Sequence, residues 1–234
     1  MDLLSNRALK YSFNDPVHYC CFIDGITNGT YEVSYAGDHG VLAAVKGRDI
    51  TVISAGSIED AVWFAAELDS PKVIQCLNEE IVDFLKASYG LRGSVACYNC
   101  AYIKRDKIDF TSPYEIRTLD ISFNDIICSN YDLGGPEEIE AQLSNGKMIG
   151  AFSESGELMG FIGTHMDGSV GMLFVFPGFR RLGVAYALEA ELINRLLDTG
   201  HIPYCHIISD NSASLALQRK LGYTISDKMV YWLY

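Results

Sequence analysis

The residues whose types and spacing point most clearly to a chemical role lie in one predicted turn. They are Arg180, Arg181, Gly183 and Ala185. A strand-like apolar run reaches Pro177 just before them, and a long helical pattern follows. The first N–H groups of a helix have no partner within it and lie at the positive end of its dipole, so a turn of this kind binds anions. Glycine lets the backbone approach a ligand closely, and the arginines add positive charge. The pattern predicts a pyrophosphate site, although packing alone can also select this spacing in α/β proteins.

The order of residues in this turn resembles the main motif of the GNAT superfamily of acyl-CoA-dependent N-acyltransferases. That motif is Arg or Gln, two residues, Gly, one residue, and Gly or Ala, and it is matched by Arg180, Gly183 and Ala185. The family's Leu-x-Val-x-Pro positions upstream are matched as well. They are filled by Leu173, Val175 and Pro177.

A second stretch, residues 210–223, resembles the second motif of the same family. Asn211 opens a predicted helix, which ends in the Leu-Gly-aromatic sequence Leu221, Gly222 and Tyr223. The resemblance covers residues 113–234. It implies the α/β (α+β) fold class, with a GNAT-like mixed central sheet flanked by helices and a smaller N-terminal α/β domain before it.

The resemblance also implies acetyl-CoA as cosubstrate and assigns residues to its parts. The backbone of Phe174, Val175 and Phe176 is expected to pair with the pantetheine arm, and Asn211 is expected to hydrogen-bond the same arm. The pyrophosphate is expected to lie against the turn and the start of the helix. The residues of that segment are Arg180, Arg181, Leu182, Gly183, Val184, Ala185 and Tyr186. No metal site is predicted.

Acyl transfer to an amine needs a group that takes a proton from the ammonium and a way for the thiolate to leave. The family often places a tyrosine acid where this chain has Gln218, so another group, water or unaided departure must serve here. For the base, the nearest ionisable side chains before the motif-bearing strand are His165 and Asp167. His165 titrates in the useful range, whereas Asp167 is also typical of a turn. His206 and a water relay are the alternatives.

Composition limits the classes of function. The chain has 234 residues, 49% of them hydrophobic, and a formal net charge of −12. This charge disfavours nucleic-acid binding and suits a cationic acceptor, although ordinary solubility explains it more simply. Seven cysteines, an odd number, and the lack of a long apolar run or hydrophobic leader favour a soluble cytoplasmic protein without a membrane partner.

The predicted elements fall into two groups. The charged run 104–107 and Pro113 mark the expected boundary between an N-terminal α/β domain, 1–112, and a GNAT domain, 113–234. In the first, strands are expected at 30–36, 41–45, 49–54, 72–76 and 94–104, with helices capped by Ser57 and Asn78. In the second, strands are expected at 115–119, 147–153, 157–165, 168–176 and 203–209, helices at 122–131, 136–143 and after 184 and 211, and a closing hairpin at 224–233. The N-terminal half is compatible with a degenerate second copy of the fold.

These observations favour transfer of an acetyl group from acetyl-CoA to a primary amine of a small molecule. One alternative is a catalytically weakened acyl-CoA-binding sensor, which the glutamine at 218 permits. Others are an acceptor amine on a protein, and a longer or aromatic acyl donor as in the glycine acyltransferases. Oligomeric state is left open, with a homodimer among the alternatives.

Overall fold

The computed structural model describes residues 1–68 and 70–234, and these form two compact units. The first unit comprises Met1–Ala101, Tyr204–Arg219 and Tyr223–Tyr234, and the second comprises Tyr102–Pro203 and Lys220–Gly222. These units are defined by contacts within the chain. The expected domains, 1–112 and 113–234, instead divide the sequence at one point, between the stretch that resembles the family and the stretch before it. This division stays a prediction.

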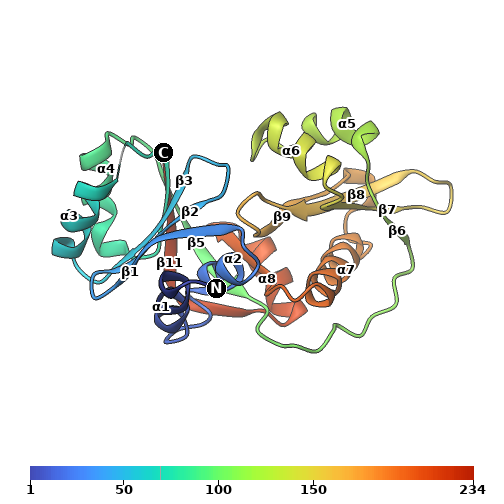
Figure 1. Ribbon diagram of the computed structural model, residues 1–234. Helices are drawn as coiled ribbons and strands as arrows, with labels where there is room; N and C mark the ends of the chain where they lie inside the picture. Colours follow the sequence, from blue (N-terminus) through green and yellow to red (C-terminus); the bar gives the residue numbers. More distant parts are fainter. Residues whose placement is uncertain (69) are drawn as a thin grey trace. The chain divides into compact units, whose positions relative to one another are not determined.

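The first unit is built on a seven-stranded sheet in the order β1-β2-β3-β4-β11-β5-β10 (Figure 1). Neighbouring strands are antiparallel, except for the parallel pair β3 and β4. Helices α3 and α4 enclose a core around Phe64, Ile74 and Leu85, while α1 and α2 pack near β1. The elements are α1 (Leu3–Ser12), α2 (Cys20–Thr27), β1 (Tyr31–Gly37), β2 (Gly40–Val45), β3 (Ile50–Ala55), α3 (Ile58–Glu67), β4 (Val73–Cys76), the 3-10 turn η1 (Glu79–Ile81), α4 (Val82–Tyr89), β5 (Ser94–Ala101), β10 (Tyr204–Ile208), β11 (Thr224–Leu233) and most of α8 (Ser212–Leu221).

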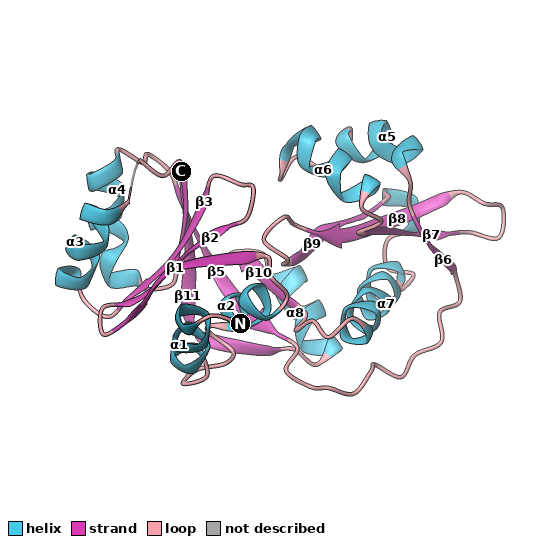
Figure 2. Cartoon of the chain, in the orientation of Figure 1, coloured by secondary structure: helices cyan, strands magenta, loops and turns pink. Residues whose placement is uncertain are grey.

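The second unit contains an antiparallel four-stranded sheet in the order β6-β7-β8-β9 (Figure 2). Helices α5 and α6 cover one face, where Ile127, Ile139, Phe161 and Met172 belong to one buried cluster, and α7 packs on the other face. The elements are β6 (Glu115–Thr118), η2 (Ile121–Phe123), α5 (Asn124–Cys128), α6 (Gly135–Ser144), β7 (Met148–Phe152), β8 (Leu158–Thr164), β9 (Val170–Val175), η3 (Pro177–Phe179) and α7 (Val184–Asp198). None of the helices in the described residues is both long and apolar enough to cross a membrane.

The order of elements repeats along the chain. From α1 to β5 the series is two helices, three strands, helix, strand, helix and strand, and the same series runs from α5 to β11. The last strands of the two series are exchanged within the seven-stranded sheet. Strand β11 lies between β4 and β5, and β10 pairs with β5. The mixed sheet and flanking helices confirm the predicted fold class.

Local predictions have mixed outcomes. The cap at Ser57 is confirmed, because its hydroxyl accepts a hydrogen bond from the N–H of Asp60 at 3.1 Å. Asn78 is the N-cap residue of η1, which leads into α4, but its side chain makes no cap hydrogen bond and its oxygen instead accepts from Ala55 N at 3.0 Å. The closing hairpin is wrong. Residues 224–233 form one strand, and its pairing with β5 is interrupted between Ile225 and Met229.

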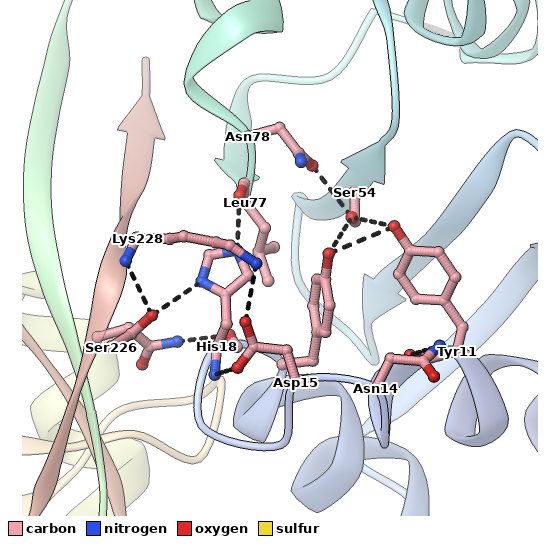
Figure 3. A network of polar contacts seen from close by, with 11 residues as sticks. Tyr11, Asn14, Asp15, His18, Ser54, Leu77, Asn78, Ser226 and Lys228 are labelled. Carbon is pink, nitrogen blue, oxygen red and sulfur yellow. Dashed lines mark hydrogen bonds and ion pairs between the residues drawn. The ribbon is translucent and has the colours of Figure 1, made fainter.

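A buried polar network joins the segment after α1 to the interruption in β11 (Figure 3). The imidazole Nε2 of His18 lies 2.8 Å from the carbonyl oxygen of Leu77, and its Nδ1 lies 3.5 Å from Ser226 Oγ. A carbonyl oxygen can only accept, so Nε2 carries the proton and Nδ1 accepts from the Ser226 hydroxyl. Lys228 extends the network through an ion pair with Asp15 at 2.8 Å. The α1 to α2 connection is thereby fixed to the last strand.

Acid should weaken this connection. Burial lowers the pKa of His18 below 6.5, although the hydrogen bond to Leu77 opposes the shift. The unfolded chain then binds the proton more readily than the folded one, so we expect His18 to reduce the free energy of unfolding as the pH falls below about 6.5. His18→Gln should cost about 1–3 kcal/mol near neutral pH and remove this part of the acid dependence. Urea unfolding at about pH 7.5 and about pH 5.5 measures both effects.

His39 provides a control, because its side chain is 41% exposed. His39→Gln should change the free energy of unfolding by about 1 kcal/mol or less near neutral pH, because the ion pair that His39 forms with Asp60 at 2.6 Å is partly exposed to water. The same pH dependence in His18→Gln as in the unsubstituted protein would contradict the prediction.

Candidate active site

The anion-binding turn has the backbone that the sequence pattern requires. After β9, η3 leads into Arg181 and Gly183, which both adopt left-handed backbone with φ values of +67° and +88°. Gly183 is the N-cap of α7. The first N–H groups of α7 therefore lie at the turn formed by residues 180–183, where they can donate to an anion.

The turn is open in front of its glycines. In the described part of the chain, a Cβ placed on Gly178 or Gly183 would meet no heavy atom within 4 Å. Tyr114 fixes the turn from behind, because its hydroxyl donates to the carbonyl oxygen of Leu182 at 2.5 Å. The peptide unit is planar and trans, so this bond turns the following N–H, that of Gly183, away from Tyr114. The turn therefore offers both unfilled space and backbone N–H donors for a phosphate group.

The end of β9 leads directly into the turn. Strand β9 is an edge strand of its four-stranded sheet, and the N–H of Phe176 donates to Met159 on β8 at 3.0 Å. Backbone groups alternate in direction along a strand, so the N–H and C=O of Val175 face the edge. Arg180 Nε donates to the Val175 carbonyl oxygen at 3.1 Å.

Of the three predicted arm-binding residues, Val175 is therefore the one whose backbone is placed for an added partner. Phe174 and Phe176 contribute their rings to a cluster with Phe161, at centroid distances of 5.6 and 6.4 Å from it. Their side chains pack against the buried cluster that contains Phe161.

A second polar group lies on the α5 and α6 side of the same sheet. His165 Nδ1 lies 3.2 Å from Glu138 Oε1, and His165 Nε2 lies 3.3 Å from the Tyr131 hydroxyl. Tyr131 in turn accepts a hydrogen bond from the N–H of Met172 at 3.2 Å. Glu138 Oε1 also accepts from Met166 N at 2.8 Å. The predicted base is thus one member of a chain of hydrogen bonds that ends on β9.

Strand β9 is bulged at this point. Phe161 pairs with Phe174 and Gly163 with Gly171, so two residues of β9 stand opposite one residue of β8. Met172, in the bulge, has a φ of +53°, a conformation that costs energy for a residue with a side chain. The hydrogen bond from its N–H to Tyr131 helps to hold this backbone.

The electrostatics of His165 favour its protonated form. Burial by itself would lower its pKa, but the hydrogen bond to Glu138 and the charges of Asp167 and Glu138 prevail and raise the pKa above 6.5. Burial raises the pKa of Tyr131 to about 12, so its hydroxyl stays protonated at neutral pH. The other predicted base, Asp167, is buried in the turn between β8 and β9. Its Oδ1 accepts from the N–H and hydroxyl of Ser169 at 3.0 and 2.7 Å, as expected of a turn-forming residue.

Asn211, Gln218 and His206 belong to the first unit. Asn211 Oδ1 accepts from Ser214 N at 3.0 Å and caps α8. Gln218 is buried on the same helix. His206 lies on β10, with its Nε2 3.2 Å from Gln75 Nε2.

Three residues of the site were missed from the sequence: Tyr114, Tyr131 and Glu138. Each acts through a contact distant in the chain, such as the 34 residues that separate Tyr131 from His165. No local motif marks them. An N-capping glycine just before α6, Gly134, is the one nearby signal, and it is equally typical of a loop.

Comparison with known proteins supplies the context for this geometry. The FR47-like protein family matches residues 148–233, from β7 to the end of β11. No curated protein matches the sequence.

Several solved structures are similar over nearly the whole chain. A Drosophila protein from a structural genomics project superposes with a TM-score of 0.72 at 17% identity, over 98% of this chain and 94% of that one. A GCN5-related N-acetyltransferase-like protein from Streptococcus suis gives 0.56 at 16% identity, over 99% and 100%. A tandem GNAT protein from the clavulanic acid biosynthesis pathway gives 0.51 at 13% identity, over 99% and 94%. At this level of identity the likeness is one of fold.

Proposed function

From the GNAT superfamily fold that this chain adopts, we propose that it is an N-acetyltransferase, which transfers the acetyl group of acetyl-CoA to a primary amine of a small molecule. The observation that carries the proposal is the open turn at Gly183. It combines a left-handed glycine, unfilled space and the N-terminus of α7, and two arginines precede it in the chain.

The residues of the turn fit a pyrophosphate, and the edge of β9 fits a peptide-like arm. Residues 180–186 would hold the phosphates and Val175 the arm, while Asn211 is proposed to contact the arm as well. When bound, acetyl-CoA would supply an activated thioester. An acceptor amine is cationic at neutral pH, and the net charge of −12 supports an acceptor of that kind.

We further propose one acyl-CoA site in each chain, in the second series of elements. The counterpart of the turn in the first series lies before α3, where Glu59 and Asp60 occupy the first helical turn. Negative side chains at this position disfavour an anion. The counterpart of the β9 edge is β3, which is paired with β4 at four successive positions from Ile50 to Ile53. The tandem GNAT relative supports the interpretation of the first series as a degenerate copy.

Ligand-dependent stability tests the cofactor. At about one hundred times its dissociation constant, a ligand adds roughly 2.7 kcal/mol to stability. For a chain of this size we expect CoA and acetyl-CoA to raise the midpoint of thermal unfolding by about 5–10 °C, and NAD or ATP to raise it much less. Calorimetric titration should give one CoA per chain. Equal shifts with all nucleotides, or none, would contradict the proposal.

Turnover separates the enzyme from the alternative, an acyl-CoA sensor. The absence of a tyrosine at Gln218 is the observation that favours the sensor. Release of CoA from acetyl-CoA can be followed with polyamines, amino acids, aromatic amines and peptide N-termini as acceptors. Tight CoA binding without release for any amine would favour the sensor.

A further inference from the structure

The two ring nitrogens of His165 are both occupied by neighbouring side chains. Glu138 Oε1 faces Nδ1 at 3.2 Å, and the Tyr131 hydroxyl faces Nε2 at 3.3 Å. Behind the ring lies Gly171, where a Cβ would collide with Nε2 and its neighbouring carbon. Both hydrogen-bonding atoms of the His165 ring are therefore engaged, one by Tyr131 and the other by Glu138.

The hydrogen-bond directions in this chain follow from the chemistry of each group. A carboxylate only accepts, so neutral His165 carries its proton on Nδ1 and donates it to Glu138. Nε2 is then an acceptor, and the Tyr131 hydroxyl donates to it. The hydroxyl oxygen of Tyr131 accepts from Met172 N–H at 3.2 Å. A hydroxyl has one donor and two acceptor positions, so one acceptor position of Tyr131 is available for a further donor.

We propose that Tyr131 is a catalytic residue, through whose hydroxyl the proton of the acceptor ammonium reaches His165. This rests on the proposed acetyltransferase function. In the step, the ammonium N–H bond breaks and its proton forms a new bond to Tyr131 Oη. The original Oη–H bond breaks at the same time, and that proton bonds to Nε2 of His165. The electron pair stays on the amine nitrogen, which becomes the nucleophile, while His165 becomes an imidazolium.

Glu138 is a positioning residue for this step. Its carboxylate keeps the proton of neutral His165 on Nδ1 and balances the charge once Nε2 is protonated. The charged groups that face His165 are Glu138 from α6 and Asp167 from the β8 to β9 turn, and both are acidic. The imidazolium is thus formed in a negative environment, which favours proton uptake.

The location of the Tyr131 hydroxyl supports the same role. It contacts the bulge of β9 at Met172, on the strand that continues through Val175 into the anion-binding turn. A backbone hydrogen bond also helps to hold Tyr131 in place, because its N–H donates to the carbonyl oxygen of Ile127 at 2.9 Å. One strand therefore carries both the arm-binding edge and the end of the proton chain.

Nitrogen NMR of the histidine rings tests the arrangement in the full chain without any ligand. We expect neutral His165 to have its proton on Nδ1 and to titrate above pH 6.5. Glu138→Gln should lower the pKa of His165, because it removes the negative charge while keeping an acceptor. Neutral His165 protonated on Nε2 would overturn the proposal.

Kinetics test the catalytic role. With acetyl-CoA and the amine selected by the screen, Tyr131→Phe should lower kcat by about 10²-fold to 10⁴-fold and leave the thermal shift by CoA unchanged. Tyr89→Phe is the matched control, since Tyr89 also bonds a backbone group, Ala65 O at 3.3 Å, far along the chain from the site. It should stay within twofold. Glu138→Gln should move the acidic limb of the pH profile in step with the NMR pKa.

A purely structural role for Tyr131 predicts a different pH dependence. If the hydroxyl carries the proton, the defect of Tyr131→Phe should shrink above the pKa of the amine itself, where no proton need be removed before attack. A defect of constant size across pH, or turnover within threefold of the unsubstituted protein, would overturn the proposal. Absence of turnover in the unsubstituted protein would instead overturn the acetyltransferase function, and the catalytic role of Tyr131 with it.

Discussion

A chain of residues 113–234 alone is expected not to fold, although it contains both GNAT motifs. In the full chain, β5 lies between β10 and β11 and pairs with them at five and seven positions. Removing β5 and β4 leaves β10 and β11 without these partners, each lost backbone hydrogen bond being worth about 0.5–1.5 kcal/mol. It also exposes Tyr204, Val230 and Leu233, which are buried on these strands. Together these losses are comparable to the roughly 5–15 kcal/mol by which domains are stable.

Circular dichroism, urea unfolding and amide NMR of the shortened chain measure this outcome. The control is the same chain expressed together with a separate chain of residues 1–112, which restores β4 and β5 and should recover cooperative unfolding. A shortened chain that unfolds cooperatively by itself would contradict the exchange of strands and support 113–234 as an independent domain.

Gly183→Val is expected to weaken CoA binding by at least about 100-fold, which is roughly 2.7 kcal/mol. The branched side chain would fill the space in front of the α7 N-terminus, where, among residues 1–68 and 70–234, no heavy atom apart from those of the chain neighbours lies within 4 Å of the Cβ position. It would also strain the backbone, since φ is +88°, at a cost of about 1–3 kcal/mol of stability. Calorimetric titration with CoA measures the first effect and urea unfolding the second.

Gly47→Val separates the two effects. Gly47 has a φ of +70° and also has open space at its Cβ position, but it belongs to the first unit. It should cost similar stability and leave CoA binding unchanged. Comparable loss of CoA binding in both variants would mean that Gly183 acts through general strain, and unchanged binding in Gly183→Val would place the phosphates elsewhere.

The predictions that the structure confirmed rested on local pattern. The turn from Pro177 to Gly183 and the helix after it could be predicted because strand, turn and helix signals follow one another within a few residues. Helices α1 and α2 were not predicted. Helix α1 buries little beyond Ala8 and Ser12, so it shows no apolar stripe, and α2 is buried along almost its whole length, so it has no polar face to reveal the helical period.

The errors came from contacts distant in sequence. Residues 226–228 have the composition of a turn. In the structure they lie opposite Asn99, the one residue of β5 between the partners of Ile225 and Met229, and Ser226 is hydrogen-bonded to His18. The strand therefore continues through an irregularity. Pairing of His165 with Glu138 and Tyr131 likewise depends on the packing of α6 and the α5 connection against β8 and β9. Sequence spacing could nominate His165 as a base but could not indicate what orients it.

The central place of β5 also governs how the first unit can form. Tyr98 is paired with Ile207 on one side and with Met229 on the other, each more than a hundred residues further along the chain. Such pairings close very long loops, and high contact order slows folding by orders of magnitude. During synthesis β1 to β5 are made before β10 and β11. The edges of β4 and β5 therefore stay unpaired until the last strands of the sheet have been made. Unpaired edges of this kind invite association between chains, so the yield of folded protein should depend on chaperones and on chain concentration more than its final stability suggests.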